Sequence, residues 1–124
     1  MNIPSDLLYT KDHEWIKIEN DIATVGITDY AQGELGDIIF IELPEIGDSV
    51  LAKASIGTIE AVKTVADIYS PMNGEVSEVN LNLLDNPDSI NTDPYHTGWI
   101  LKLNNFTNNY DNYLTPDEYK ILIQ

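Results

Sequence analysis

Short runs of β-forming residues, each closed by a turn-forming residue, make up most of the chain and limit it to folds built from short strands. The longest unbroken aliphatic or aromatic run, residues 38–41, has four members, whereas a membrane-spanning helix needs about 20 apolar residues. The pattern predicts strands at residues 15–18, 22–28, 38–43, 50–52, 56–60, 64–69, 74–79 and 99–103. We therefore expect a mainly β protein without a membrane-spanning segment.

Three of these strands carry specific signals. Asn20 and Asp21 separate the first two strands, and both residue types tolerate the positive φ of a tight hairpin turn. Residues 38–43 are almost continuously apolar and are followed by Pro44. The first signal predicts a hairpin, and the second predicts a strand that is covered on both faces.

The strongest helix signal lies near the C-terminus. Thr115 is an N-cap candidate, Pro116 occupies the favoured first helical position, and Glu118 completes a capping box. Leu114 and Tyr119 have the spacing of a hydrophobic staple. We expect a capped helix that starts at Pro116.

The remaining signals complete the expected fold. One short helix should follow Thr28 and stop near Gly36, and a single turn could open at residues 86–88. Residues 47–50 and 74–77 each place a glycine, an acid and a β-former at a strand entrance, which suggests two stacked antiparallel sheets. The fold class is therefore mainly β: an antiparallel sandwich or flattened barrel with a few short helices and a C-terminal helix. At 124 residues, the chain is expected to form one domain, 1–124.

Charge limits the classes of partner. The net charge is −15 with a pI near 4.1, and all six basic residues are lysines. A field of that sign repels nucleic acid and anionic lipid and favours partners that present basic surfaces. We therefore expect neither nucleic-acid binding nor membrane binding.

The ends and the cysteine content bear on the compartment. No basic residue precedes Lys11 and no apolar stretch follows it, so neither a secretory signal nor an arginine-rich transit peptide is expected. There are no cysteines, which excludes a disulfide scaffold and a thiolate metal site. The protein is expected in the cytoplasm, or in the mitochondrial matrix if it is a processed organellar protein.

Few side chains offer chemistry of their own. There are two histidines, His13 and His96, and no HxH or HxxxH spacing; a metal site built from them and nearby acids stays open. Phosphate-binding, dinucleotide and hydrolase motifs are absent from the sequence. Close acid pairs are unavoidable among 21 carboxylates and are no sign of catalysis. We expect a non-catalytic binding module, or a carrier of chemistry that another group supplies.

Lys63 makes the carrier alternative concrete. It lies between two β-forming runs, and residues 59–66 contain no Gly, Asn, Asp or Pro that would make a hairpin turn. Local propensity alone therefore leaves open whether Lys63 is an ordinary solvated strand residue or a site of attachment.

The segment Glu60-Ala61-Val62-Lys63, followed by residues 70–76, resembles the lipoyl-lysine region of the H proteins of the glycine cleavage system. The resemblance continues in order along nearly the whole chain, through residues 9–15, 23–32, 35–38, 42–44, 79–80 and 91–99. Biotinyl domains and the lipoyl domains of 2-oxoacid dehydrogenases are less similar, because Val62 and Thr64 flank the lysine here.

This resemblance implies a fold, a cofactor and partners. The fold is the lipoyl-domain type, a barrel-sandwich hybrid, with Lys63 at the tip of an exposed hairpin and lipoate joined to its ε-amine. The lipoyl arm would carry an aminomethyl group from glycine decarboxylase (P protein) to the tetrahydrofolate-dependent aminomethyltransferase (T protein). Dihydrolipoamide dehydrogenase (L protein) would reoxidise the arm, and a lipoate ligase or a lipoyl or octanoyl transferase would attach it. The carrier itself is expected to be a monomer.

The resemblance also assigns roles to individual residues. Glu60 matches a position used in recognition by the lipoylating enzyme, and Gly47 and Gly74 would act indirectly through the turns that set the hairpin register. Glu14 and Asp67 match carboxylates that would protect the aminomethyl-loaded arm by keeping its amine protonated.

Two alternatives remain open from the sequence. One is an H-like carrier that hands its lipoyl group to other proteins or serves another lipoate-dependent pathway. The other is an unmodified acidic β-domain that acts as an interaction module. The mass of protein made in a lipoylating host separates the second alternative from the carriers.

Overall fold

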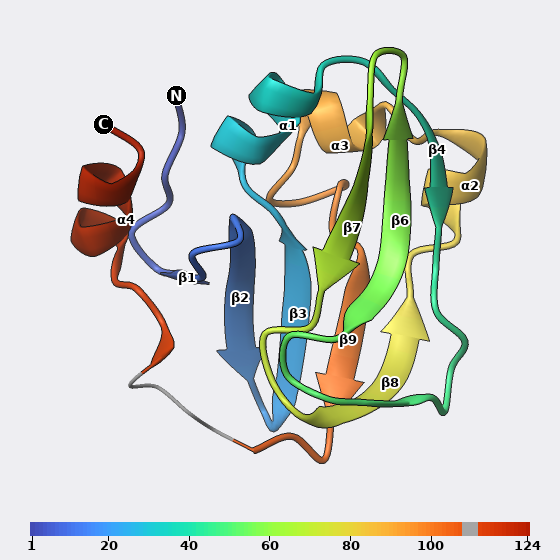
Figure 1. Cartoon of the computed structure of the whole chain (residues 1–124). Helices are drawn as coiled ribbons and strands as arrows, with labels where there is room; N and C mark the ends of the chain where they lie inside the picture. The colour runs from blue at the N-terminus through green and yellow to red at the C-terminus, as the bar shows by residue number, and fades with distance from the viewer. Residues whose placement is uncertain (108–111) are drawn as a thin grey trace.

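The computed structural model describes residues 1–107 and 112–124, and it consists of two antiparallel sheets packed face to face (Figure 1). The larger sheet has the strand order β1-β2-β3-β9-β8-β5. Its strands are β1 (Leu8–Tyr9), β2 (Glu14–Glu19), β3 (Ile22–Ile27), β9 (Leu101–Asn104), β8 (Gly74–Val79) and β5 (Ser49–Val50). The smaller sheet, β4-β6-β7, consists of β4 (Ile38–Glu42), β6 (Ser55–Ala61) and β7 (Val65–Tyr69). The prediction of two stacked antiparallel sheets is confirmed.

The first hairpin forms where its turn residues predict it. Glu19 pairs with Ile22, and the two residues between them, Asn20 and Asp21, have φ values of 50° and 65°. These values match the type of tight turn that follows the natural twist of antiparallel strands. Two residues that tolerate positive φ are therefore sufficient to place this turn.

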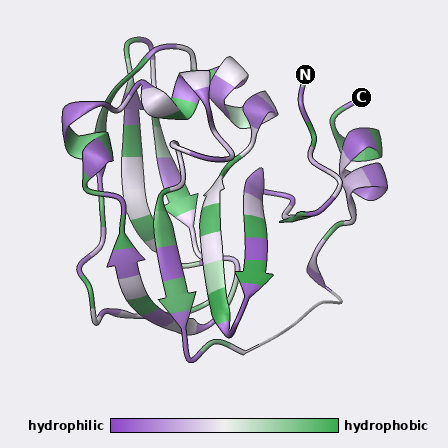
Figure 2. Cartoon of the chain, turned by 180° about the vertical axis from the view of Figure 1, so that it is seen from behind, coloured by the Kyte–Doolittle hydropathy of each residue, from purple (hydrophilic) through white to green (hydrophobic). Residues whose placement is uncertain are grey.

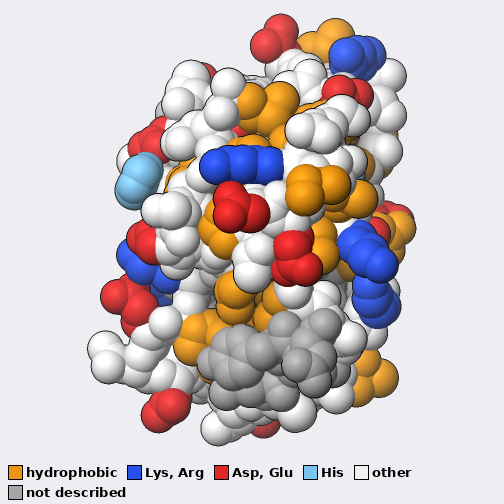
Figure 3. Space-filling model, turned by 90° about the vertical axis from the view of Figure 1, so that its left-hand side faces the viewer, with side chains coloured by type: hydrophobic (Ala, Val, Ile, Leu, Met, Phe, Trp, Pro, Cys, Tyr) orange, Lys and Arg blue, Asp and Glu red, His pale blue; other side chains and the backbone are white. Residues whose placement is uncertain are grey.

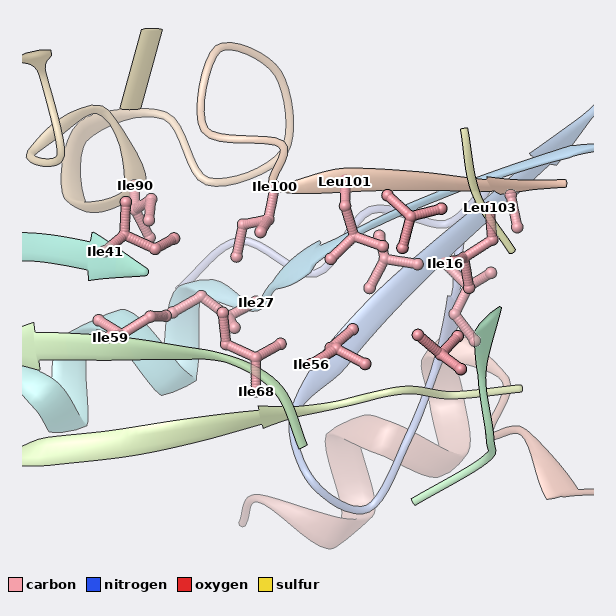
Figure 4. Packing of buried hydrophobic residues seen from close by; sticks show 14 of the residues in the cluster. Ile16, Ile27, Ile41, Ile56, Ile59, Ile68, Ile90, Ile100, Leu101 and Leu103 are labelled. Atoms are coloured by element: carbon pink, nitrogen blue, oxygen red, sulfur yellow. The ribbon is translucent and has the colours of Figure 1, made fainter. Parts of the chain in front are cut away.

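The core lies between the two sheets. Ile41, Ile59 and Ile68 of the smaller sheet point inward and belong to the same buried cluster as Ile27 and Leu101 of the larger sheet (Figure 4). Along the larger sheet, apolar and polar residues alternate, as expected for a sheet with one buried face (Figure 2). Each such buried aliphatic side chain contributes roughly 1.5–3 kcal/mol to folding, so the core holds the sheets that position the site.

The helices of residues 1–107 and 112–124 lie at the ends and edges of the sheets: α1 (Asp29–Leu35), α2 (Asn82–Asp85), α3 (Ser89–Thr92) and α4 (Pro116–Leu122). The capping box of α4 is present in both directions between Thr115 and Glu118. Thr28 caps the start of α1, and Gly36 ends it with a φ of 80°. In the described part of the chain, no helix is long and apolar enough to cross a membrane.

Two short elements, β1 and α2, escape prediction from the sequence. β1 has two residues, and its Tyr9 also bridges to Leu114 ahead of α4. α2 has four residues, no side-chain cap, and only Leu83 buried. Elements of this length form because of the contacts around them, so the local sequence carries little signal for them.

The prediction that residues 38–43 are covered on both faces is wrong. Ile39 and Phe40 in β4 are 54% and 52% exposed, whereas Ile38 and Ile41 are buried. β4 is an edge strand of the smaller sheet, and its register with β6 shifts between Ile38 and Phe40. Because no third layer of described residues covers the outer face of this sheet, the apolar run is only half buried (Figure 1).

The two similar segments at 47–50 and 74–77 contribute to the same sheet. Val50 of β5 pairs with Gly74 of β8 in the larger sheet, and β6 pairs with β7 beyond them. β5 leads into β6, and β7 leads into β8, so the β5–β8 pair lies at the base of the hairpin that β6 and β7 form.

Candidate functional site

Lys63 lies at the tip of the β6–β7 hairpin, and its side chain is exposed. The turn is closed by a hydrogen bond from the backbone N–H of Ala61 to the carbonyl of Thr64, at 2.8 Å. A second bond, 3.0 Å long, runs from the N–H of Val62 to the carbonyl of Asp37, just after α1. The turn therefore forms without turn-favouring residues because a distant segment holds it in place.

The segment that supports the tip is itself anchored by one side chain. The amide group of Asn91 donates to the carbonyl of Gly36 at 2.9 Å and accepts from the N–H of Ile38 at 3.0 Å. A Cβ atom added to Gly36 would lie 3.2 Å from Cε of Lys63, so the lysine stem passes close over this glycine. Gly36 and Asn91 thus position the hairpin tip; the sequence gives no local sign of this, because 55 residues separate the two groups.

Glu60 and Asp67 both lie on the outer, exposed face of the smaller sheet. Glu60 is paired with Phe40 on one side and with Val65 on the other. Asp67 is paired with Thr58, one row nearer the base of the hairpin. Since side chains alternate between faces along a strand, residues in these rows point to the same side as Glu60.

Gly47, just before β5, and Gly74, at the start of β8, lie near the base of the β6–β7 hairpin, at the opposite end from Lys63. Gly47 has a φ of 96° and donates its N–H to the carbonyl of Val76 at 2.8 Å. A Cβ atom at Gly74 would lie 3.1 Å from Cβ of Phe106, so close packing is the constraint there. Both positions therefore favour glycine, for different reasons.

Glu14 is buried at a cleft of about 450 Å³. Its carboxylate accepts a hydrogen bond from the hydroxyl of Thr10 at 2.6 Å and interacts with the backbone of Tyr69 at the end of β7. Burial raises the pKa of Glu14 to about 7. A carboxyl group with such a pKa changes its charge near neutral pH and responds strongly to a nearby cation.

The cleft reaches the smaller sheet at the end of β7. Its described lining includes Ser70 and Lys53 but not Asp67, which lies two residues before Tyr69 on the exposed face of β7. From Lys63 to Asp67 the strand extends about 13 Å. Lys63 therefore comes just before β7, Asp67 follows it within the strand, and the cleft with Glu14 lies at the end of the strand.

The two histidines are engaged in separate contacts. His13 Nδ1 lies 2.9 Å from the hydroxyl of Tyr119, and burial lowers the pKa of His13. His96 Nδ1 lies 3.0 Å from a carboxylate oxygen of Asp93. In the described residues, no three His, Asp or Glu side chains come together in a way that could hold a metal ion.

Carboxylates and lysines occur side by side on the face of the molecule that carries the termini (Figure 3). Figure 3 shows acidic side chains on the face that carries the termini, next to lysines and hydrophobic side chains. With a net charge of −15, the protein presents a negative field to any partner.

Residues 7–124 match the family model described as glycine cleavage H-protein. A glycine cleavage system H protein of Rubrobacter xylanophilus is 55% identical, covering 94% of this chain and 91% of its own. One from Staphylococcus carnosus is 47% identical, covering 99% and 98%. The crystal structure of a glycine cleavage system H protein from Mycobacterium marinum superposes with a TM-score of 0.86 at 41% identity, covering 94% and 95%. On the match over 7–124 and these identities, the chain belongs to the glycine cleavage H-protein family.

Proposed function

We propose that this protein is the lipoyl carrier of a glycine cleavage system, with lipoate attached to Lys63. The observation that carries this proposal is the position of Lys63 at an exposed hairpin tip in a chain of the H-protein family. No salt bridge of the described residues includes Lys63. Because the Lys63 side chain is exposed, an enzyme that acylates it can reach its amine.

Lipoate would supply the redox chemistry that the chain lacks. Its dithiolane can accept an aminomethyl group and be reduced, and the chain has no cysteine that could compete. We infer that glycine decarboxylase loads the arm, that the aminomethyltransferase unloads it to tetrahydrofolate, and that dihydrolipoamide dehydrogenase reoxidises it. A small acidic body is suited to short contacts with several enzymes, because charge speeds their encounter.

The decisive experiment measures intact mass and then activity. Protein made in a lipoylating host should gain the mass of one lipoyl group. With decarboxylase, transferase, dehydrogenase and tetrahydrofolate added, it should then support release of ammonia from glycine. A modified protein that fails in this assay would favour a carrier for another pathway, and an unmodified one would favour an acidic interaction domain.

We expect Glu60 to contribute to recognition by the lipoylating enzyme. Its carboxylate is exposed three residues before Lys63, on a strand held from both sides. Glu60→Ala should slow modification by a lipoate ligase about tenfold, as for loss of a contact in an interface, at an unchanged melting temperature. Glu45→Ala, which removes another exposed carboxylate, is the control. Equal modification rates for the Glu60 variant and the parent would contradict the role.

We further propose that Glu14 and Asp67 protect the loaded arm. An aminomethyl group on sulfur decays once its amine loses a proton, and nearby carboxylates keep that amine protonated. Glu14→Ala and Asp67→Ala should leave lipoylation intact but speed spontaneous ammonia release from the loaded protein, with the double variant fastest. A time course of ammonia release from purified, loaded protein measures this. Decay at the parent rate in all variants would show that other groups provide the protection.

A further inference from the structure

The outer face of the smaller sheet carries an apolar row directly below the hairpin tip. Phe40 of β4 and Val65 of β7 lie on either side of Glu60, in register across the sheet. Their exposed fractions are 52% and 60%. Figure 1 shows this face of β4, β6 and β7 towards the viewer, and no helix of the described residues crosses it.

The same region exposes two more apolar side chains near the tip. Val62, next to Lys63, is 71% exposed, and Ile39, at the register shift of β4, is 54% exposed. Val62 is joined to the segment ahead of β4 by its hydrogen bond to Asp37. Single exposed apolar residues are common, but several around one functional group mark an interaction surface.

Carboxylates border this apolar row. Glu60 lies within it, and Glu42 and Asp67 flank Thr58 in the next row. All three acids are exposed. In the described chain, no salt bridge involves any of the three. A complementary partner therefore has an apolar contact surface surrounded by basic side chains.

The possible partners differ in the part of the carrier that each must contact. Enzymes that act on the dithiolane meet the far end of the arm, well away from the hairpin backbone. The enzyme that attaches lipoate must instead bring an activated carbonyl to the ε-amine of Lys63, and it therefore has to cover the tip and the surface beside it. Val65, in the apolar row, is only two residues from Lys63 and lies within that covered area.

We propose that Phe40 and Val65, on either side of Glu60, form the docking surface for the enzyme that joins lipoate to Lys63. This inference rests on the proposed lipoylation. In the reaction of a ligase, ATP first converts the lipoate carboxylate to an acyl adenylate with release of pyrophosphate. The deprotonated amine of Lys63 then attacks the carbonyl; an amide bond forms, the bond to AMP breaks, and the amine loses its second proton to solvent. Docking places this amine and does not take part in the chemistry.

The test compares Phe40→Thr and Val65→Thr with the parent as substrates of a lipoate ligase supplied with ATP and free lipoate. Threonine keeps the β-propensity of both strands. We expect kcat/KM for the protein substrate to fall about tenfold in Phe40→Thr and less in Val65→Thr. The loss should appear in KM, with kcat at saturating protein unchanged. Ile46→Thr, at a 65% exposed site in the loop after β4, is the matched control and should behave as the parent.

Four results would overturn the docking surface. The variants could be modified at the parent KM, or the Ile46 control could lose as much as they do. Fully lipoylated Phe40→Thr could react with dihydrolipoamide dehydrogenase more slowly by the same factor, which would assign the surface to that enzyme. The parent could also dimerise through Phe40 in sedimentation experiments. Failure of the proposed function looks different, since the parent itself would then gain no lipoyl mass.

Discussion

Replacing Lys63 with arginine is expected to abolish lipoylation while leaving the protein folded. A guanidinium stays protonated at any pH that the enzyme tolerates, so it has no free electron pair to attack an acyl adenylate. The side chain is exposed at a turn whose hydrogen bonds, from Ala61 to Thr64 and from Val62 to Asp37, join backbone groups only. Intact mass after incubation with a lipoate ligase should therefore show no gain, and the melting temperature should match that of the parent.

Lys53→Arg is the matched control for this experiment. Lys53 is also exposed, and its ammonium group lies 3.8 Å from a carboxylate of Asp12 at the cleft. This variant should gain one lipoyl group as the parent does. If Lys63→Arg still gained that mass, the attachment site would be at another lysine, and the role proposed for Glu60 would have no basis.

Replacing Glu14 with glutamine is expected to remove a marked pH dependence of stability. Burial raises the pKa of Glu14 from 4.5 to about 7 in the folded protein. Between these values the folded state holds a proton that the unfolded state has lost, so the free energy of unfolding falls as pH rises. The loss amounts to about 3 kcal/mol and is complete above the folded pKa.

Glutamine keeps an oxygen that can accept the hydrogen bond from Thr10 but carries no charge to bury. At pH 8, Glu14→Gln should therefore be more stable than the parent by up to about 3 kcal/mol. Below about pH 4.5 the two proteins should be equally stable. Urea unfolding at pH 4, 6 and 8 measures the difference. Glu45→Gln, at an exposed site, should follow the parent at every pH; parallel curves for Glu14→Gln and the parent would show that Glu14 is not buried as a neutral acid.

Local chemistry determined the elements whose signals lie within a few residues. Asn20 and Asp21 place the first turn because both adopt positive φ at low cost. Thr115 and Glu118 start α4 because each satisfies a backbone N–H at the helix end. The motif around Lys63 likewise predicts the attachment position from sequence alone, through its resemblance to the lipoyl-lysine region of the H proteins, and the attachment itself is our proposal.

Tertiary structure decided the environment of these residues. The turn at Lys63 depends on Asp37 and on Asn91, which are distant in sequence, because no local residue favours a turn there. The pKa of Glu14 depends on burial by segments from several parts of the chain. Phe40 belongs to an apolar run that predicts a buried strand, yet it is exposed because β4 lies at a sheet edge with one face uncovered. A residue's own type sets its local geometry, but which face is buried follows from how the two sheets pack against each other.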